Sequence, residues 1–440
     1  MSFQSTSTRP RARLLRYVAS AALGIAPIVA VTTLAGSVAH AQEASPLTLQ
    51  DAISRAVEAD PGLRAAGAGV DAARGGLRQA RARPNPELSA EVENFNGQGE
   101  LRGFDGAETT FSLSQEVELG GRRSARVQLA NRELHGAELE RTIRGLDLIR
   151  ETQIAYFDAL AAEELVAIAR ERLETAQALS ASVSRRVAAA RDPLMAGARA
   201  EAGLAEARIA LTRAQAEAAT ARANLASLLG GDTGFTLIAA DFSAPRTIEH
   251  AHDTPTDAAP DLARLTAERD RANAATRVER SLAWQNPTVS FGYRQFAADD
   301  DEGALVAGFS VPLGIFDRNQ GSVSRARAEQ RRAEFDLEAG RRTLQREFSA
   351  LQRAIAADAA AISATEDEVI PQAERALELA QDGYNRGAFS YLDVLEAQRA
   401  LSDARQSRVD ALRTFHNNEA ALDRLTARFA DTLPEQEAHQ

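Results

Sequence analysis

The sequence of 440 residues contains no cysteine, and this absence excludes several features at once. Without thiols the chain forms no disulfide bond, has no cysteine nucleophile and offers no N-terminal cysteine for a lipid anchor. Methionine is almost as scarce, because Met195 is the only one after the initiator. We therefore expect no ladder of thioether ligands for soft copper ions.

The short motifs that mark common catalytic sites are also missing. The sequence has no G-x-S-x-G nucleophile elbow, no H-E-x-x-H zinc motif and no G-x-x-x-x-G-K-[ST] phosphate loop. We therefore predict that the protein is not an enzyme and that it needs no cofactor.

A long apolar run occurs only near the start of the chain. Residues 1–41 combine four arginines, an apolar stretch and "AHA" at 39–41, which is the pattern of a cleavable signal peptide. A retained N-terminal anchor is the alternative, and the cleavage pattern argues against it. No later stretch of about 18 apolar residues occurs, so we expect no transmembrane helix.

Positive charge is in short supply. The chain has 51 basic and 62 acidic side chains, a net charge of −11. The predicted signal peptide holds four of the basic residues and no acidic one, which leaves 47 against 62, or −15. A chain this acidic binds nucleic acid poorly, and we expect no nucleic-acid partner.

What the sequence does contain is an internal repeat of about 200 residues. An Asn-Pro pair precedes an alternating segment twice, at 85–86 and at 286–287. Chance similarity between alanine-rich helices does not explain pairs of similar segments that contain proline and glycine. The three pairs of similar segments are 83–95 with 284–296, 110–130 with 308–328, and 186–208 with 385–405.

Each repeat predicts a helix, two strands, a very long helix, a turn and another long helix. Residues 47–82 are rich in alanine and arginine and predict the first helix, and the alternation of apolar and polar residues predicts the strands. The predicted organisation is a signal peptide (1–41), a first repeat (42–229), a crossover (230–257), a second repeat (258–428) and a disordered tail (429–440).

Four strands of about ten residues match the length that crosses a bilayer with tilt. A sheet in lipid cannot leave an edge unpaired, and known closed sheets start at about eight strands, so one chain cannot close alone. Narrow apolar stripes on the long helices also require neighbours. The alternative is a periplasmic coiled-coil scaffold with two small hairpins, but the polar residues that alternate along the strands suit a water-filled lumen better.

The motifs and their order resemble a known family. "ELGGRR" (118–123), "PLGIFDRNQG" (312–321) and "YNRGAFSYLDVLEAQ" (384–398) are similar to the TolC-type outer-membrane efflux proteins, and most to their CzcC-like heavy-metal branch. The resemblance covers nearly all of the chain after the signal peptide. It implies an α+β membrane protein that assembles as a homotrimer, with a 12-stranded β-barrel in the outer membrane and a long α-barrel in the periplasm.

The same resemblance implies partners and a function. The partners would be a periplasmic adaptor protein, an inner-membrane transporter of the resistance-nodulation-division type and outer-membrane lipid. The predicted function is the exit duct of a tripartite system that exports divalent heavy-metal cations. Drug efflux or type I protein secretion through the same channel is the first alternative, and the scaffold without a pore is the second.

The last turn is the strongest candidate site. Gly387 permits the left-handed conformation that ends a helix, and Ser390 with Asp393 has the spacing of a capping box. Capping does not account for Glu396 or for Tyr384. By motif match, Tyr384, Asp393 and Glu396 take the positions that constrict the periplasmic end of the pore in this family. The family's best-known member has a basic residue two positions after the glycine, where this sequence has Phe389, so the resemblance does not extend to a salt bridge there.

The corresponding turn of the first repeat lacks this charge. Asp192 is predicted as the N-cap of the next helix and Pro193 as its first residue. Ala190 takes the place of the glycine, and no carboxylate follows at the matching position, Ala196. We therefore expect a gate that differs between the two hairpins.

Histidine offers only a weak metal site. His250 and His252 lie in "EHAHD" with an acidic residue on each side, but a third fixed ligand is not evident. A solvated loop explains the segment without metal.

Overall fold

The computed structural model describes residues 45–99, 102–104, 106–231, 233–238, 240–243, 259–297 and 302–434. The predicted signal peptide lies outside these ranges. The chain from Ala44 onward forms one compact unit.

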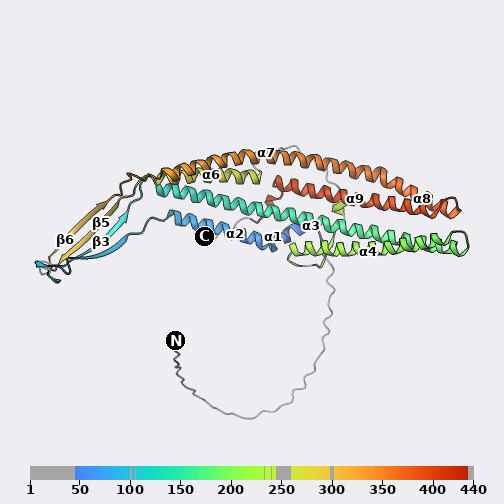
Figure 1. The fold of residues 1–440 in the computed structure, drawn as a ribbon, viewed down its shortest axis with the longest axis horizontal. Coiled ribbons are helices and arrows are strands. Elements are labelled where there is room, and N and C mark those ends of the chain that lie inside the picture. The colour runs from blue at the N-terminus through green and yellow to red at the C-terminus, as the bar shows by residue number, and fades with distance from the viewer. Residues whose placement is uncertain are drawn as a thin grey trace, which may run out of the picture. The chain divides into compact units, whose positions relative to one another are not determined.

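Four antiparallel strands form a sheet beyond one end of the helices (Figure 1). They are hydrogen-bonded in the order β2 (Glu87–Glu93), β3 (Glu108–Glu116), β5 (Thr288–Phe296) and β6 (Gly303–Ser310). Each repeat supplies one hairpin, and β3 joins the two hairpins by pairing with β5. Among the described residues, no strand pairs with the outer edge of β2 or of β6.

The two faces of this sheet differ in polarity, as the alternation predicts. Leu88, Leu113 and Phe291 lie opposite one another in one row across the strands, and they are 76%, 53% and 66% exposed. On the other face Arg294 donates to Glu108 at 2.7 Å and pairs with Glu93 at 3.0 Å. One face is therefore an exposed apolar surface, and the other is charged and hydrogen-bonded.

Each repeat continues from its hairpin into long helices. The 67 residues of α3 extend about 100 Å at 1.5 Å per residue. No helix in the described part of the chain is both long and apolar enough to cross a membrane. The long helices are α3 (Arg122–Ala188) and α4 (Leu194–Leu228) in the first repeat, then α7 (Gln320–Ala364), the π-helical turn η2 (Thr365–Val369), α8 (Ile370–Arg386) and α9 (Tyr391–Leu425) in the second.

Two shorter helices precede the strands, α2 (Pro61–Arg81) and α6 (Pro260–Ser281). Near the sheet, contacts place the helices in the order α2-α3-α6-α7. Towards the hairpin turns, the order is α4-α3-α9-α8. The predicted succession of helix, two strands and helical hairpin is confirmed in both repeats.

Two motifs from the sequence meet where the sheet joins the helices. Asn286 accepts the backbone N–H of Leu119 at 2.9 Å and donates to Glu116 at 2.6 Å. Gly120 has a φ of 62° and lies so close to Trp284 that a Cβ would collide with the indole. The Asn-Pro segment of the second repeat therefore contacts the "ELGG" segment of the first and holds the two repeats together.

The segment 47–82 is not the continuous helix that its composition predicts. It starts in strand β1 (Ser45–Leu47), and helix α1 (Leu49–Ala59) is separated from α2 at Asp60. The Asp60 carboxylate accepts the N–H of Leu63 at 2.5 Å, and Pro61 occupies the first position of α2, where no backbone donor is needed. These local cap signals override the alanine content.

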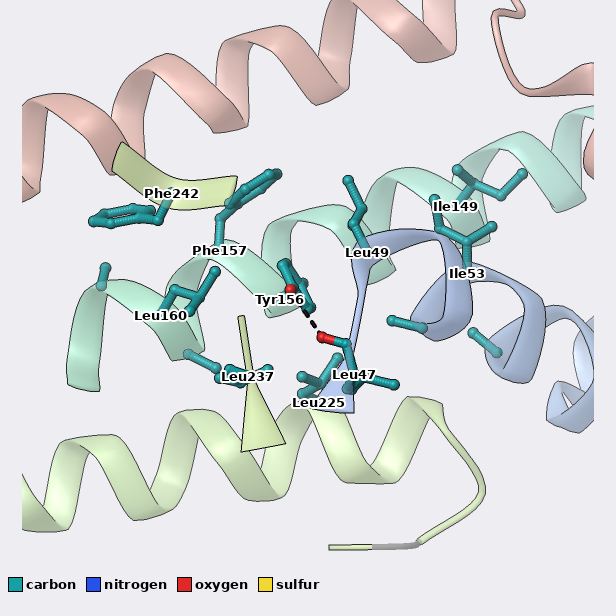
Figure 2. Close-up of a cluster of buried hydrophobic side chains, with 14 of the residues drawn as sticks. Leu47, Leu49, Ile53, Ile149, Tyr156, Phe157, Leu160, Leu225, Leu237 and Phe242 are labelled. Atoms are coloured by element: carbon teal, nitrogen blue, oxygen red, sulfur yellow. Dashed lines mark hydrogen bonds between the residues drawn. The ribbon is translucent and has the colours of Figure 1, made fainter. Parts of the chain in front are cut away.

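The main hydrophobic core joins both repeats. Figure 2 shows the part of this core around Tyr156. Strand β1 pairs in parallel with β4 (Phe235–Leu237), and the short helix α5 (Ala240–Ser243) follows. Tyr156 of α3 is fully buried, and its hydroxyl donates to the carbonyl of Leu47 at 3.0 Å. Phe348 of α7 and Phe415 of α9 complete the same core.

The predicted disordered tail over 429–440 needs correction in its first half. Phe429 and Leu433 pack against the core, and Leu433 lies against Gly145 of α3. A 3-10 turn (Ala430–Thr432) joins them. The polar sequence around these two apolar side chains does not indicate that they pack against the core. Residues 435–440 lie outside the described ranges.

Candidate functional site

The turn between α8 and α9 has the predicted local geometry. Gly387 ends α8 with a φ of 79°, and the N–H of Ala388 donates to the carbonyl of Gly383 at 2.8 Å. This left-handed position is open to glycine without strain. The prediction for Gly387 is confirmed.

The start of α9 is a capping box formed by Ser390 and Asp393. The backbone N–H and the hydroxyl of Ser390 both donate to Asp393 Oδ2 at 2.7 Å. These two hydrogen bonds lower the pKa of the Asp393 carboxyl, which keeps it charged at neutral pH. The predicted roles of Ser390 and Asp393 in the turn are confirmed.

The turn between α3 and α4 differs from its prediction. Pro193, not Asp192, is the N-cap of α4, and its carbonyl accepts the N–H of Ala196 at 2.9 Å. The Asp192 side chain turns away from the helix start, because Arg186 binds it with two guanidinium nitrogens at 3.0 and 3.1 Å. A paired guanidinium outcompetes a single backbone donor for the carboxylate.

Asp192 also links the two hairpins. The Tyr384 hydroxyl donates to Asp192 Oδ2 at 2.7 Å. Arg186 Nη1 donates to the Tyr384 carbonyl at 3.0 Å, and the guanidinium carbon lies 4.5 Å from the centre of the tyrosine ring. Arg186, Asp192 and Tyr384, here called the tip cluster, thus connect the end of α3 to the end of α8.

The electrostatics of the tip cluster favour this arrangement at neutral pH. Hydrogen bonds from Arg186 and then from Tyr384 lower the pKa of Asp192. Burial, and secondly the hydrogen bond to Asp192, raises the pKa of Tyr384 to about 12. Asp192 is therefore a charged acceptor and Tyr384 a neutral donor.

The predicted gate residues do not form one group. Tyr384 is 3% exposed and belongs to the tip cluster. Asp393 is exposed and binds Ser390, while Glu396 is exposed one turn further along α9. A role for these three residues in a gate stays a proposal.

Arg186 is the residue that the sequence analysis missed. The signal available was Phe389, which packs against Gly383 and offers no positive charge to Asp192. With no cation at position 389, the charge of Asp192 requires another arginine, and Arg186 lies six residues before it. No local pattern distinguishes Arg186 from the many other arginines of α3.

The weak metal candidates His250 and His252 fall outside the described residues. Among the residues that the structure does describe, no three histidine, aspartate or glutamate side chains are grouped so as to hold a metal ion.

Comparison with known proteins places these features in context. A family model described as outer membrane efflux protein matches residues 52–231 and 256–428. The cobalt-zinc-cadmium resistance protein CzcC of Cupriavidus metallidurans is 32% identical over 392 residues, which cover 88% of this chain and 91% of CzcC. The nickel-cobalt-cadmium resistance protein NccC of Alcaligenes xylosoxydans xylosoxydans is 28% identical, covering 68% of this chain and 67% of NccC.

A solved structure shares the fold. The outer membrane protein VceC from Vibrio cholerae superimposes with a TM-score of 0.72 at 22% identity, covering 86% of this chain and 96% of VceC. The architecture of repeated strand hairpins and long helical hairpins is therefore that of the TolC-like proteins.

Proposed function

The chain belongs to the outer membrane efflux protein family, and we propose that it is the exit duct of a tripartite system that exports divalent heavy-metal cations. The observation that carries the proposal is the family match to both repeats, together with 32% identity to CzcC over most of both chains. A periplasmic scaffold without a pore gains no support from either finding.

The proposed assembly is a homotrimer in the outer membrane. The free edges of β2 and β6 expose backbone donors and acceptors, which in lipid need another strand as partner. The apolar face with Leu113 and Phe291 suits contact with lipid, and the face with Arg294 suits water. Three copies would join their strands into one closed sheet of twelve.

The proposed partners lie at the other end. The hairpin turns are the parts of the chain farthest from the sheet (Figure 1), so a periplasmic adaptor and an inner-membrane transporter of the resistance-nodulation-division type would deliver cargo there. The cargo is inferred from the names of CzcC and NccC, both of which are metal-resistance proteins.

Two features support a gate at the turns. The tip cluster ties one hairpin to the other within each chain. Asp393 and Glu396 are exposed on α9, and repeated around a threefold axis they would form rings of negative charge that favour cations over anions.

Deletion of the gene in its own host tests the cargo. We expect lower tolerance of cobalt, zinc and cadmium salts, restored by the gene on a plasmid, and unchanged tolerance of organic drugs. Unchanged metal tolerance with greater drug sensitivity would support the first alternative instead. Purified protein should also form ion channels in a planar bilayer, and a protein without channel activity would favour the scaffold.

A further inference from the structure

An exposed phenylalanine stands on the outer side of α7. Phe335 is 73% exposed, whereas Ala333, Leu337 and Leu344 of the same helix are buried. At about 100° per residue, Phe335 points about 180° away from the mean direction of those three side chains. A large aromatic side chain on the side opposite its own chain's packing is available for contact with a neighbouring copy, and aromatic residues are enriched at such interfaces.

The outer side of α2 has the complementary shape. Leu63, Val70 and Leu77 are buried and mark the side that packs on α3. The opposite side of the helix carries only small residues in its middle turns, and its three alanines are exposed. These small residues are Ala65, Ala68, Ala72 and Gly75.

The connections to the sheet bring these two surfaces together between copies. Helix α2 leads into β2, and β6 leads into α7. In the row α2-α3-α6-α7 the two helices are the outer members, just as β2 and β6 are the outer strands. If β2 of one copy pairs with β6 of the next, as the proposed function requires, then α2 of one copy lies beside α7 of the next.

The contacts between α7 and α6 show how far Phe335 lies from the sheet along the helix axes, a position called its height below. Gly340 packs against Leu265 of α6. Phe335 lies about one and a half turns nearer the sheet, so it is level with about residue 270 of α6. Asp270 in turn pairs with Arg132 of α3 at 3.5 Å.

The contacts between α3 and α2 show which residues of α2 lie at the same height. Arg126 donates to the carbonyl of Ala80 at 3.1 Å, and Arg144 pairs with Asp60 at 3.2 Å. Interpolation between these two contacts places Arg132 level with about residue 73 of α2. Phe335 therefore stands at the height of Ala72 and Gly75.

We propose that Phe335 of each copy packs into the small-residue surface of α2, centred on Ala72, in the neighbouring copy. Small side chains let the helix backbones approach closely enough for the aromatic ring to fill the space between the turns. The inference rests on the proposed function, because it needs a second copy of the chain, and it adds the residues that join the copies below the sheet.

Disulfide cross-linking tests this contact directly, because the chain has no cysteine of its own. The test pair is Phe335→Cys with Ala72→Cys in one full-length chain, oxidised in membranes and separated on denaturing gels. The matched control is Glu334→Cys with Ala72→Cys, since Glu334 is exposed on another side of α7. We expect about tenfold more linked subunits for the test pair, because a disulfide requires Cα atoms within about 7 Å.

Two outcomes overturn the inference in different ways. If the protein is a trimer by mass but the test pair links no better than the control, the helix contact is wrong and the proposed assembly stands. If the protein is a monomer in membranes, both are wrong.

A second measurement does not depend on disulfide geometry. Phe335→Ala should lower the temperature at which the trimer dissociates in detergent, whereas Glu334→Ala should not. Phe335→Leu should restore part of the loss, since it again fills the surface of α2. Equal dissociation temperatures for all three variants would contradict the contact.

Discussion

Tyr384 uses its ring and its hydroxyl for different contacts at the tip. The ring receives the Arg186 guanidinium, and the hydroxyl donates to Asp192. Tyr384→Phe keeps the ring and removes a hydrogen bond to a charged acceptor, which contributes about 1–3 kcal/mol. If the tip cluster holds the duct closed, this variant should raise single-channel conductance or open time in a planar bilayer.

Tyr391→Phe is the matched control for this prediction. Tyr391 is buried on α9 near the same turn, but its hydroxyl does not belong to the tip cluster. Conductance that is unchanged in Tyr384→Phe, or raised equally in Tyr391→Phe, would show that the tip cluster does not restrain the pore.

The pH dependence of the tip cluster follows from the direction of two pKa shifts. The pKa of Asp192 is lowered in the folded tip. Its contribution to the stability of the tip cluster is therefore present above the ordinary aspartate value of about 4, and it is lost as pH falls through the lowered pKa. The pKa of Tyr384 is raised to about 12, so its contribution is lost only as pH rises beyond about 10. Channel recordings should show no pH-dependent opening between pH 5 and 8, because this range lies above the loss at Asp192 and below the loss at Tyr384. Opening within this range would contradict the role of Asp192.

Ala190 carries strain that a glycine would relieve. Its φ is 53°, in the left-handed region, where the corresponding residue of the second repeat is Gly387. A side chain in this conformation costs about 1–2 kcal/mol. Ala190→Gly should therefore raise the thermal stability of the folded protein, whereas Ala189→Gly, at a φ of −85°, should lower it or leave it unchanged. Lower stability in Ala190→Gly would show that the strain is compensated elsewhere in the turn.

At the scale of the elements, the first turns of α9 combine two tasks. Asp393 caps the helix, whereas Glu396 is exposed, has no hydrogen bond or ion pair among the described residues, and under the proposed function would act on ions. Glu396→Gln should therefore weaken cation preference in bilayer recordings without changing stability. Asp393→Ala should weaken cation preference and also lower the stability of the folded protein, by about 1 kcal/mol, because the helix cap is lost.

Glu378→Gln provides the control, because Glu378 is an exposed carboxylate of α8 that pairs with Arg375. A change of selectivity in this variant as large as that in Glu396→Gln would assign the effect to overall charge and not to a ring at the turn.

The sequence predicted the elements well where a pattern extends over many residues. The alternation at Val289, Phe291 and Tyr293 and that from Leu305 to Leu313 locate β5 and β6, and the run without proline after Arg122 locates α3. The sequence did not predict side-chain positions that depend on one contact with a distant residue. Asp192 fits the N-cap pattern locally, but the side chain binds Arg186 and Tyr384, and Tyr384 lies 192 positions away.

At the scale of the whole molecule, the repeat predicted how many hairpins the chain contains and in what order. It did not predict the single core in which both repeats take part, because Phe348 and Phe415 give no sign in the sequence that they meet Tyr156. The order of elements is local information, whereas their joint packing depends on all of them at once.

The pairing of β1 with β4 has a consequence for how this protein reaches its folded state. Ser45 pairs with Phe235, about 190 positions later. A chain that emerges from its N-terminus first therefore holds a strand whose partner has not yet arrived, and contacts this distant form slowly. The cluster around Tyr156 closes only after α9 has followed. The N-terminal residues of the folded unit, Ser45–Leu47, are thus among the last to be buried.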